Sequence, residues 1–147
     1  AHHFPRACID DGRLEFSFSG LKTSLLYRLR GMDQSARTAQ AADLAAGYQE
    51  AIVRVLVDRA FVAVKSSGVQ ALAVVGGVSA NSRLRALLTA RAREEGIRLA
   101  LPPMAYCTDN AAMGAIAWER LERGEHDGLD LDVLPGTDRS AGRRPPQ

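Results

Sequence analysis

The chain has 147 residues, of which 46% are hydrophobic, 24% are charged and 5% are aromatic. This composition is typical of one globular domain with a hydrophobic core, and it excludes a disordered chain. With 19 basic and 17 acidic residues, the net charge is +2, too small to indicate nucleic-acid binding from bulk charge. Few aromatic side chains are available to stack on single-stranded bases, so any contact with RNA must come from a local patch.

The first elements expected along the chain are a strand and two helices. Hydrophobic and polar residues alternate over 14–19, which predicts a strand, and a short helix is expected over about 21–30. A long helix is predicted over 39–67, because apolar residues recur at helical spacing and proline is absent. Its apolar residues occupy more than one side, which places it in the middle of a packed layer, and Gly68 is available to end it.

A strand, a helix, a second strand and a further helix are predicted next. The continuous apolar run 71–75 predicts a strand buried on both faces, as in a parallel sheet. A helix then ends at Gly96, a strand over 97–101 is closed by two prolines, and a last helix covers 111–121. This order predicts a right-handed βαβ unit and therefore an α/β fold, with parallel strands and packed helices.

The loop between the first strand of this unit and the next helix is the most informative candidate site. Gly76 and Gly77 let the backbone turn sharply and let a flat ligand lie against it. Ligands bind α/β sheets at the carboxyl ends of parallel strands, which is where this loop stands. Asn81 follows at the helix start, where it can hydrogen-bond a ribose, a base or an acyl group. The alternative, equally supported by the loop alone, is a tight turn with Ser79 or Asn81 as an N-cap.

A second candidate site precedes the last predicted helix, in the segment CTDNAAM (107–113). A carboxylate such as Asp109 is favoured at any helix start by the helix dipole, so an ordinary cap is the simpler interpretation. The following residues are small, however, and allow close packing that brings Asp109 to the same sheet edge as the glycine loop. There it is a suitable ligand for a metal ion, although one carboxylate cannot hold a metal alone.

Other patterns of chemical interest are weak. The segment GLKT (20–23) lacks the upstream glycine of a phosphate-binding loop, and no HExxH, GxSxG or Cys–His signature is present. The local basic excess lies on the helix of the βαβ unit and the strand after it. A solvated surface is the commoner interpretation of such a run, and contact with nucleic-acid phosphates is the alternative. Its members are Arg83, Arg85, Arg91, Arg93 and Arg98.

The sequence carries no pattern that indicates export or a membrane segment. The two cysteines form no CxxC pair, which excludes a disulfide framework or a zinc ribbon. No run of about 18 apolar residues and no signal-peptide pattern is present. We therefore expect a cytoplasmic protein without a membrane segment.

Four segments, in order, resemble the C-terminal part of the TsaD family, the tRNA threonylcarbamoyltransferases once labelled O-sialoglycoprotein endopeptidases. Each segment alone is weak, but their shared order and spacing make the match specific. The segments are FSFSGLKT (16–23), ADLAAGYQEAIVRVLVDRA (42–60), VVGGVSANSRLR (74–85) and CTDNAAMGA (107–115). The resemblance implies an actin-like ATPase (ASKHA) fold of two ribonuclease-H-like lobes. Residues 1–137 would then form a partial C-terminal lobe. Residues 138–147 show no periodicity, and we expect a disordered tail there.

The resemblance also implies an activity and its site. Family members transfer the threonylcarbamoyl group of threonylcarbamoyl-AMP to N6 of adenosine 37 in tRNAs that read codons beginning with A, together with other proteins of the pathway. Gly76 and Gly77 match the glycines against which the nucleotide lies, Asn81 matches a substrate contact, and Asp109 matches a ligand of one divalent metal ion, iron or zinc. The family's HxxxH metal ligands do not occur in this sequence. We therefore expect this chain to be inactive by itself.

Two further functions remain open at the level of sequence. A non-catalytic scaffold of the same pathway is one, and another actin-like ATPase, such as a sugar kinase, is the other. The presence of Asn81 and Asp109 favours the transferase over the scaffold, and the CTDNAAM segment argues against the kinase. The older protease label has no support, because the residues offer no open metal site with a general base.

Overall fold

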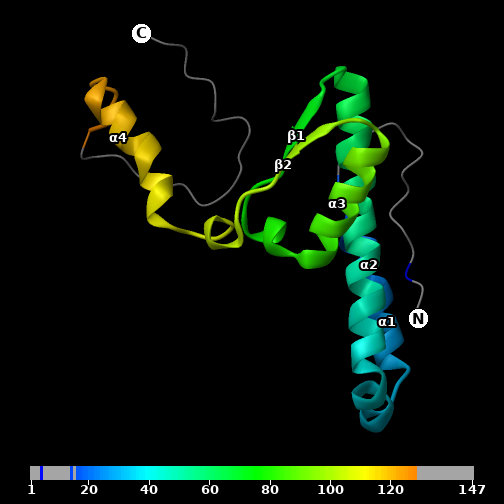
Figure 1. Ribbon diagram of the computed structural model, residues 1–147. Coiled ribbons are helices and arrows are strands. Elements are labelled where there is room, and N and C mark those ends of the chain that lie inside the picture. The colour runs from blue at the N-terminus through cyan, green and yellow to red at the C-terminus, as the bar shows by residue number, and fades with distance from the viewer. Residues whose placement is uncertain (1–3, 5–13, 15, 129–147) are drawn as a thin grey trace. The chain divides into compact units, whose positions relative to one another are not determined.

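The computed structural model describes Phe4, Leu14 and residues 16–128, and the chain divides into two units, 1–109 and 110–147 (Figure 1). The predicted tail, 138–147, lies outside the described residues. The first unit contains α1 (Ser19–Arg30), α2 (Gln34–Ser67), β1 (Ala71–Ala73), η1 (Gly77–Ala80), α3 (Ser82–Glu94), β2 (Arg98–Ala100) and η2 (Met104–Tyr106). The second unit contains η3 (Ala111–Met113) and α4 (Gly114–Glu122).

Helices α1 and α3 both lie beside the long helix α2 (Figure 1). It begins where the Asp33 side chain accepts a hydrogen bond of 2.8 Å from the Ala36 N–H, and it ends at Gly68, whose φ of 66° is left-handed. The predicted helix over 39–67 is confirmed, with a start five residues earlier because of the Asp33 cap.

Two hydrophobic clusters lie along α2, one toward each end. Near its N-terminal half, Leu44 and Ala51 pack with Leu21 of α1 and with Phe4. Toward the C-terminal end, Val53, Val57 and Phe61 pack with buried residues of α3, which are Leu84, Leu88 and Ala92. The apolar residues that the sequence predicted on more than one side of α2 therefore pack into two separate clusters.

The strands β1 and β2 form a parallel sheet of two strands, with Leu72 opposite Leu99. Together with α3 they make the predicted βαβ unit, and both strands are shorter than expected. The predicted burial of the first strand on both faces is wrong, because Leu72 and Leu99 pack on the α2–α3 core while Ala71 and Ala73 are exposed. An apolar groove of about 410 Å³ runs beside β1, and Val75 at its edge is 75% exposed.

The strand predicted over 14–19 does not form in the described residues. Leu14 and residues 16–18 have no regular structure, and α1 begins at Ser19, two residues before the predicted helix start. The rings of Phe16 and Phe18 stack with centroids 6.2 Å apart. A strand also needs a partner, and in the described part of the chain the sheet holds only β1 and β2.

The second unit carries the last predicted helix in two pieces. Residues 111–113 form the 3₁₀ turn η3, and the α-helix proper starts at Gly114. Ile116, Trp118 and Leu121 of α4 are each more than half exposed. The described residues of this unit therefore form no buried core among themselves. Within the described residues, no helix combines the length and apolar character that crossing a membrane requires.

Candidate functional site

The glycine loop after β1 is a tight turn in which the two glycines play different parts. Gly76 has a φ of 86°, a backbone conformation that residues other than glycine rarely adopt. Its carbonyl accepts hydrogen bonds from the N–H and the hydroxyl of Ser79, at 2.9 and 2.7 Å, and Ser79 is fully buried. Gly77 lies outside the left-handed region, and a Cβ added there would meet nothing within 4 Å. The turn therefore requires glycine at 76, whereas at 77 glycine leaves the backbone open to close approach.

Asn81 caps α3, and its side chain is also tied to α2. Its Oδ1 accepts a hydrogen bond of 2.9 Å from the Leu84 N–H, and its Nδ2 donates one of 2.9 Å to Gln49 Oε1. The cap interpretation of Asn81 is thus correct. An amide group has two N–H donors and two acceptor lone pairs, so one of each remains for a ligand. Capping and ligand contact are therefore compatible at this position.

The second loop places Asp109 differently from the predicted first turn of a helix. The cap of η3 is Asn110, whose side chain accepts a hydrogen bond of 3.0 Å from the Ala112 N–H. The expectation of Asp109 as a cap is therefore wrong, because its neighbour fills that role. Asp109 is exposed, and its carboxylate has no partner among the described residues. It is available to bind a cation or a donor group from elsewhere.

Both loops follow the carboxyl ends of parallel strands, and Arg85 of α3 joins them. Its Nη1 donates 2.9 Å to the carbonyl of Ser79 in the first loop, and its Nη2 donates 2.8 Å to the carbonyl of Pro102 in the second. Nη1 also lies 3.7 Å from Sγ of Cys107, which is fully buried. The glycine loop and the segment 102–107 therefore meet at one edge of the sheet, while the approach of Asp109 to the glycine loop stays a prediction.

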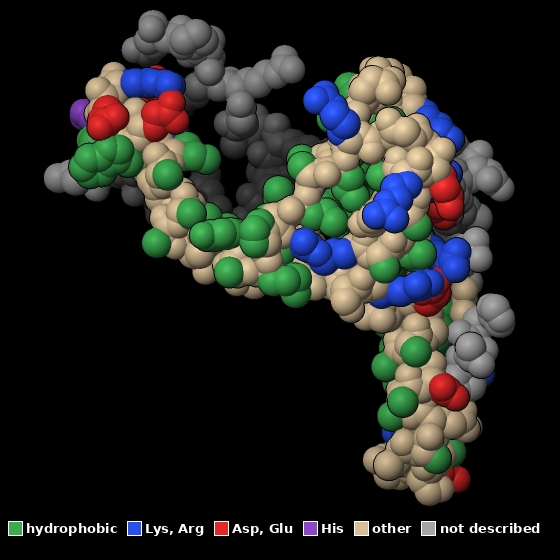
Figure 2. Space-filling view, in the orientation of Figure 1, with side chains coloured by type: hydrophobic (Ala, Val, Ile, Leu, Met, Phe, Trp, Pro, Cys, Tyr) green, Lys and Arg blue, Asp and Glu red, His purple; other side chains and the backbone are tan. Residues whose placement is uncertain are grey.

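The predicted basic run is not a continuous free patch. Arg83 is paired with Glu50 on α2 and Arg85 points to backbone carbonyls, while Arg91 pairs with Glu95 and lies 3.8 Å from Asp58. Figure 2 shows basic side chains over this part of the molecule with acidic ones beside several of them. Only Arg93 and Arg98 of the five lack a side-chain partner among the described residues. Most of the run therefore stabilises the contact between α2, α3 and the loops.

One known protein family matches most of this chain. The profile of the family "TsaD: tRNA N6-adenosine threonylcarbamoyltransferase" matches residues 1–116, which include the glycine loop, Asn81 and Asp109. The chain belongs to the TsaD family. The match spans both candidate loops and the clamping Arg85, so the features described above fall within the family segment.

Individual TsaD relatives match most of this chain but are much longer. The proteins named tRNA N6-adenosine threonylcarbamoyltransferase of Anaeromyxobacter dehalogenans (strain 2CP-1 / ATCC BAA-258) and Kosmotoga olearia are 50% and 42% identical to it, over 139 and 135 residues. That of Anaeromyxobacter sp. (strain Fw109-5) is 48% identical over 139 residues. The alignments cover 91–92% of this chain and 40–41% of the relatives. The chain thus spans about two fifths of the length of these relatives.

The metal ion implied by the resemblance to TsaD proteins requires more ligands than this segment provides. In the described part of the chain, no three His, Cys, Asp or Glu side chains come together as a metal site. The residues present therefore do not fit a complete site, and Asp109 can supply one ligand at most.

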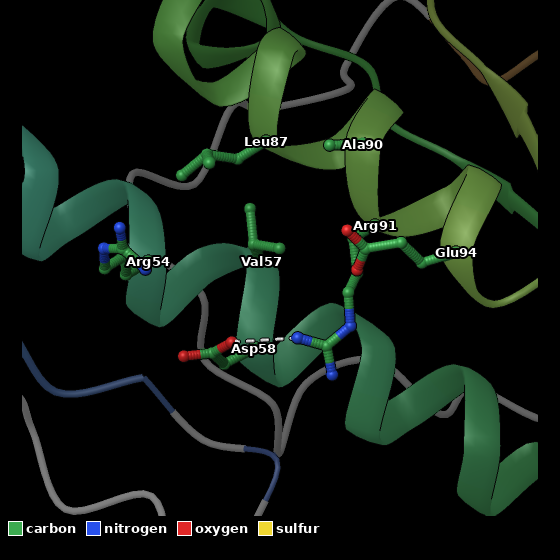
Figure 3. Close-up of a pocket in the computed structure, with 7 residues that line it drawn as sticks. All are labelled: Arg54, Val57, Asp58, Leu87, Ala90, Arg91 and Glu94. Carbon is green, nitrogen blue, oxygen red and sulfur yellow. Dashed lines mark ion pairs between the residues drawn. The ribbon is translucent and has the colours of Figure 1, made fainter.

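A small pocket between α2 and α3 is a separate candidate site in this TsaD chain (Figure 3). It has a volume of about 150 Å³ and is lined by Arg54, Val57, Asp58, Leu87, Ala90, Arg91 and Glu94. Three of its four charged side chains are in ion pairs, since Arg91 faces Asp58 and Arg54 donates 2.7 Å to Glu50. None of the two loops' residues lines it. The pocket is therefore a seam between packed helices, and its remaining charged side chain, Glu94, is exposed to solvent.

The ion pair between α2 and α3 predicts an acid dependence of stability. Two hydrogen bonds from Arg83, at 2.7 and 2.9 Å, are the main reason that the pKa of Glu50 is lowered from 4.5 to about 2. A carboxyl whose pKa is lower in the folded state than in the unfolded state stabilises the protein at a pH above its unfolded-state pKa. This stabilisation is lost as the pH falls through the folded-state pKa. The Glu50 side chain is 31% exposed, so we expect Glu50→Gln to cost only about 1 kcal/mol at pH 7.

The difference in the free energy of unfolding between wild type and Glu50→Gln should shrink from about pH 4.5 downward and vanish near pH 2. Urea unfolding at several pH values measures it. A difference that stays constant down to pH 2 would contradict the lowered pKa.

Proposed function

We propose that this chain supplies one wall of the active site of a tRNA N6-adenosine threonylcarbamoyltransferase. The complete enzyme transfers the threonylcarbamoyl group of threonylcarbamoyl-AMP to N6 of adenosine 37 in tRNAs that read codons beginning with A. One observation carries the proposal: an open glycine backbone at Gly77 and the loop of the unpartnered carboxylate Asp109 are joined at the carboxyl edge of one parallel sheet. Ligands bind α/β sheets at that edge.

The proposed task of these residues is to position an activated substrate. The adenylate lies along the backbone at Gly76 and Gly77, where no Cβ separates it from the chain, and the remaining donor and acceptor of Asn81 contact it. The adenosine amine then attacks the carbamoyl carbon, so that the N–C bond forms, the bond to the phosphate oxygen breaks, and AMP leaves while the amine loses a proton. A mixed anhydride is already reactive, so orientation supplies much of the rate.

Several finer points belong to the same proposal. Asp109 contributes one ligand to an iron or zinc ion whose other ligands come from outside the described residues. Residues 1–137 belong to the C-terminal ribonuclease-H-like lobe of an actin-like fold. The partners are tRNA and other proteins of the threonylcarbamoyladenosine pathway, in the cytoplasm. The parallel βαβ unit and the TsaD family match support this assignment.

A graft tests the proposal directly. In the graft, this chain replaces the segment that it matches in the Anaeromyxobacter dehalogenans relative, to which it is 50% identical. We expect the purified graft to form N6-threonylcarbamoyladenosine in tRNA from threonylcarbamoyl-AMP, and the 147-residue chain alone to form none. Mass spectrometry of nucleosides from the digested tRNA measures the product, and the unaltered relative is the control.

The outcome separates the transferase from its main alternative. A graft that unfolds at the temperature of the relative, but forms no modified nucleoside, would contradict the proposal. If that inactive graft still associated with the relative's pathway proteins, a non-catalytic scaffold would be the better assignment.

A further inference from the structure

Arg85 lies in the first turns of α3, where a positive charge is unfavourable. The N-terminal end of a helix carries a partial positive charge, so cations are disfavoured there and anions are favoured. Arg85 is the fourth residue of α3, and its guanidinium turns back toward that end, to Ser79 in the segment before the helix. Two carbonyl oxygens and the Cys107 sulfur offset the charge. An arginine placed against the helix dipole, with all its contacts outside its own helix, indicates a role in joining segments.

The contacts of Arg85 lead to both candidate loops through buried groups. On one side, Arg85 holds the carbonyl of Ser79, and Ser79 in turn donates both its N–H and its hydroxyl to the Gly76 carbonyl. On the other side, Arg85 holds the carbonyl of Pro102 and contacts Cys107, whose Sγ lies 3.5 Å from the Pro103 carbonyl. Each loop is thus one or two hydrogen bonds away from the same guanidinium.

The shape of the guanidinium explains why arginine is needed. Its two terminal nitrogens diverge in a fixed plane, so one side chain can donate to two carbonyls in different segments. A lysine ammonium is a single point and would reach one of the two loops. Ser79 and Cys107 are both fully buried, so the loss of Arg85 would leave the Ser79 carbonyl short of a donor at a site with little access to water.

We propose that Arg85 is a positioning residue that fixes the spacing between the glycine loop and the loop that leads to Asp109. The inference rests on the proposed function, because the spacing matters only if both loops contact one substrate. Arg85 touches neither the adenylate nor the tRNA in this account. It acts by keeping the backbone at Gly77 and the carboxylate of Asp109 at the separation that the bound adenylate requires.

The test compares Arg85→Gln and Arg85→Lys with Arg37→Gln in the graft. Arg37 is a matched control, because its Nε also donates to a backbone carbonyl, that of Leu29, at 2.9 Å, but it joins α1 to α2. The first readout is hydrogen exchange at amides that close the two loops, which are those of Ser79, Asn81, Tyr106 and Cys107. We expect Arg85→Gln to raise exchange in both loops by about tenfold or more, and Arg37→Gln to leave both unchanged.

The second readout is the kinetics of transfer. We expect Arg85→Gln to raise the KM for threonylcarbamoyl-AMP about tenfold and to lower kcat, with Arg85→Lys intermediate. A smaller folded fraction would lower kcat and leave KM unchanged, so the KM separates positioning from simple loss of stability. The Arg37→Gln graft should keep both constants.

The two readouts distinguish failure of this inference from failure of the proposed function. Unchanged exchange in either loop of Arg85→Gln would overturn the inference, whatever the activity. Faster exchange in both loops with wild-type KM and kcat would also overturn it, since the hydrogen bonds of Arg85 would then stabilise the loops without affecting the reaction. A graft without transfer activity contradicts the proposed function, while the exchange measurement still decides whether Arg85 holds the two loops together.

Discussion

Gly77→Ala is expected to lower kcat/KM for threonylcarbamoyl-AMP in the graft by about 100-fold, because an added methyl group displaces an adenylate that lies against the backbone. The folded chain itself gives no reason for glycine at this position. The φ of Gly77 is outside the left-handed region, and an added Cβ meets no atom within 4 Å. The thermal unfolding temperature should therefore stay close to that of the wild-type graft.

Gly76→Ala is the comparison for stability, since Gly76 belongs to the same proposed adenylate site but has a left-handed backbone. Gly76 has a φ of 86°, so alanine is strained there and should cost about 1–3 kcal/mol of stability. Steady-state kinetics and thermal unfolding of both variants separate the two effects. A wild-type kcat/KM in Gly77→Ala would show that the adenylate does not bind against this loop. A large loss of stability in that variant would show that the backbone needs this glycine.

Asp109→Ala is expected to abolish transfer in the graft, with a loss of at least about 100-fold in kcat, and to reduce the bound iron or zinc. Transfer should be lost because the proposed metal ion loses this ligand. The fold should be kept, because Asp109 is exposed, caps no helix and has no partner among the described residues. Elemental analysis of the purified protein and the tRNA assay measure the two effects.

The control for Asp109→Ala is Asp43→Ala, which removes an exposed carboxylate from α2. Asp43→Ala should keep both the metal content and the rate of transfer. Full activity in Asp109→Ala, or an equal loss in both variants, would refute the assignment of Asp109 to the site.

Local sequence patterns predicted the elements that depend on local interactions. The helix α2 and the βαβ unit follow from periodicity, from the absence of proline and from glycine at the ends. The strand expected over 14–19 and the burial of β1 on both faces depend instead on what lies beside these segments. Alternation and apolar runs report which side chains can be buried, and the partner that buries them is a tertiary fact.

The candidate site was predictable at the level of its loops and less so at the level of its contacts. The glycine pair and Asn81 carry their signal in adjacent residues. The partners Gln49 and Glu50 lie 32 and 33 residues away from Asn81 and Arg83, and no spacing rule connects such pairs. The sequence predicts Arg85 as part of a basic run, although a cation in the first turns of a helix indicates that groups outside the helix balance its charge.

The most direct test of the proposed site is a crystal structure of the graft with a non-reactive analogue of threonylcarbamoyl-AMP. We expect the adenylate to lie against the backbone at Gly76 and Gly77, with the carboxylate of Asp109 facing it. An adenylate bound away from this loop, or Gly77 and Asp109 at opposite ends of the sheet, would contradict it.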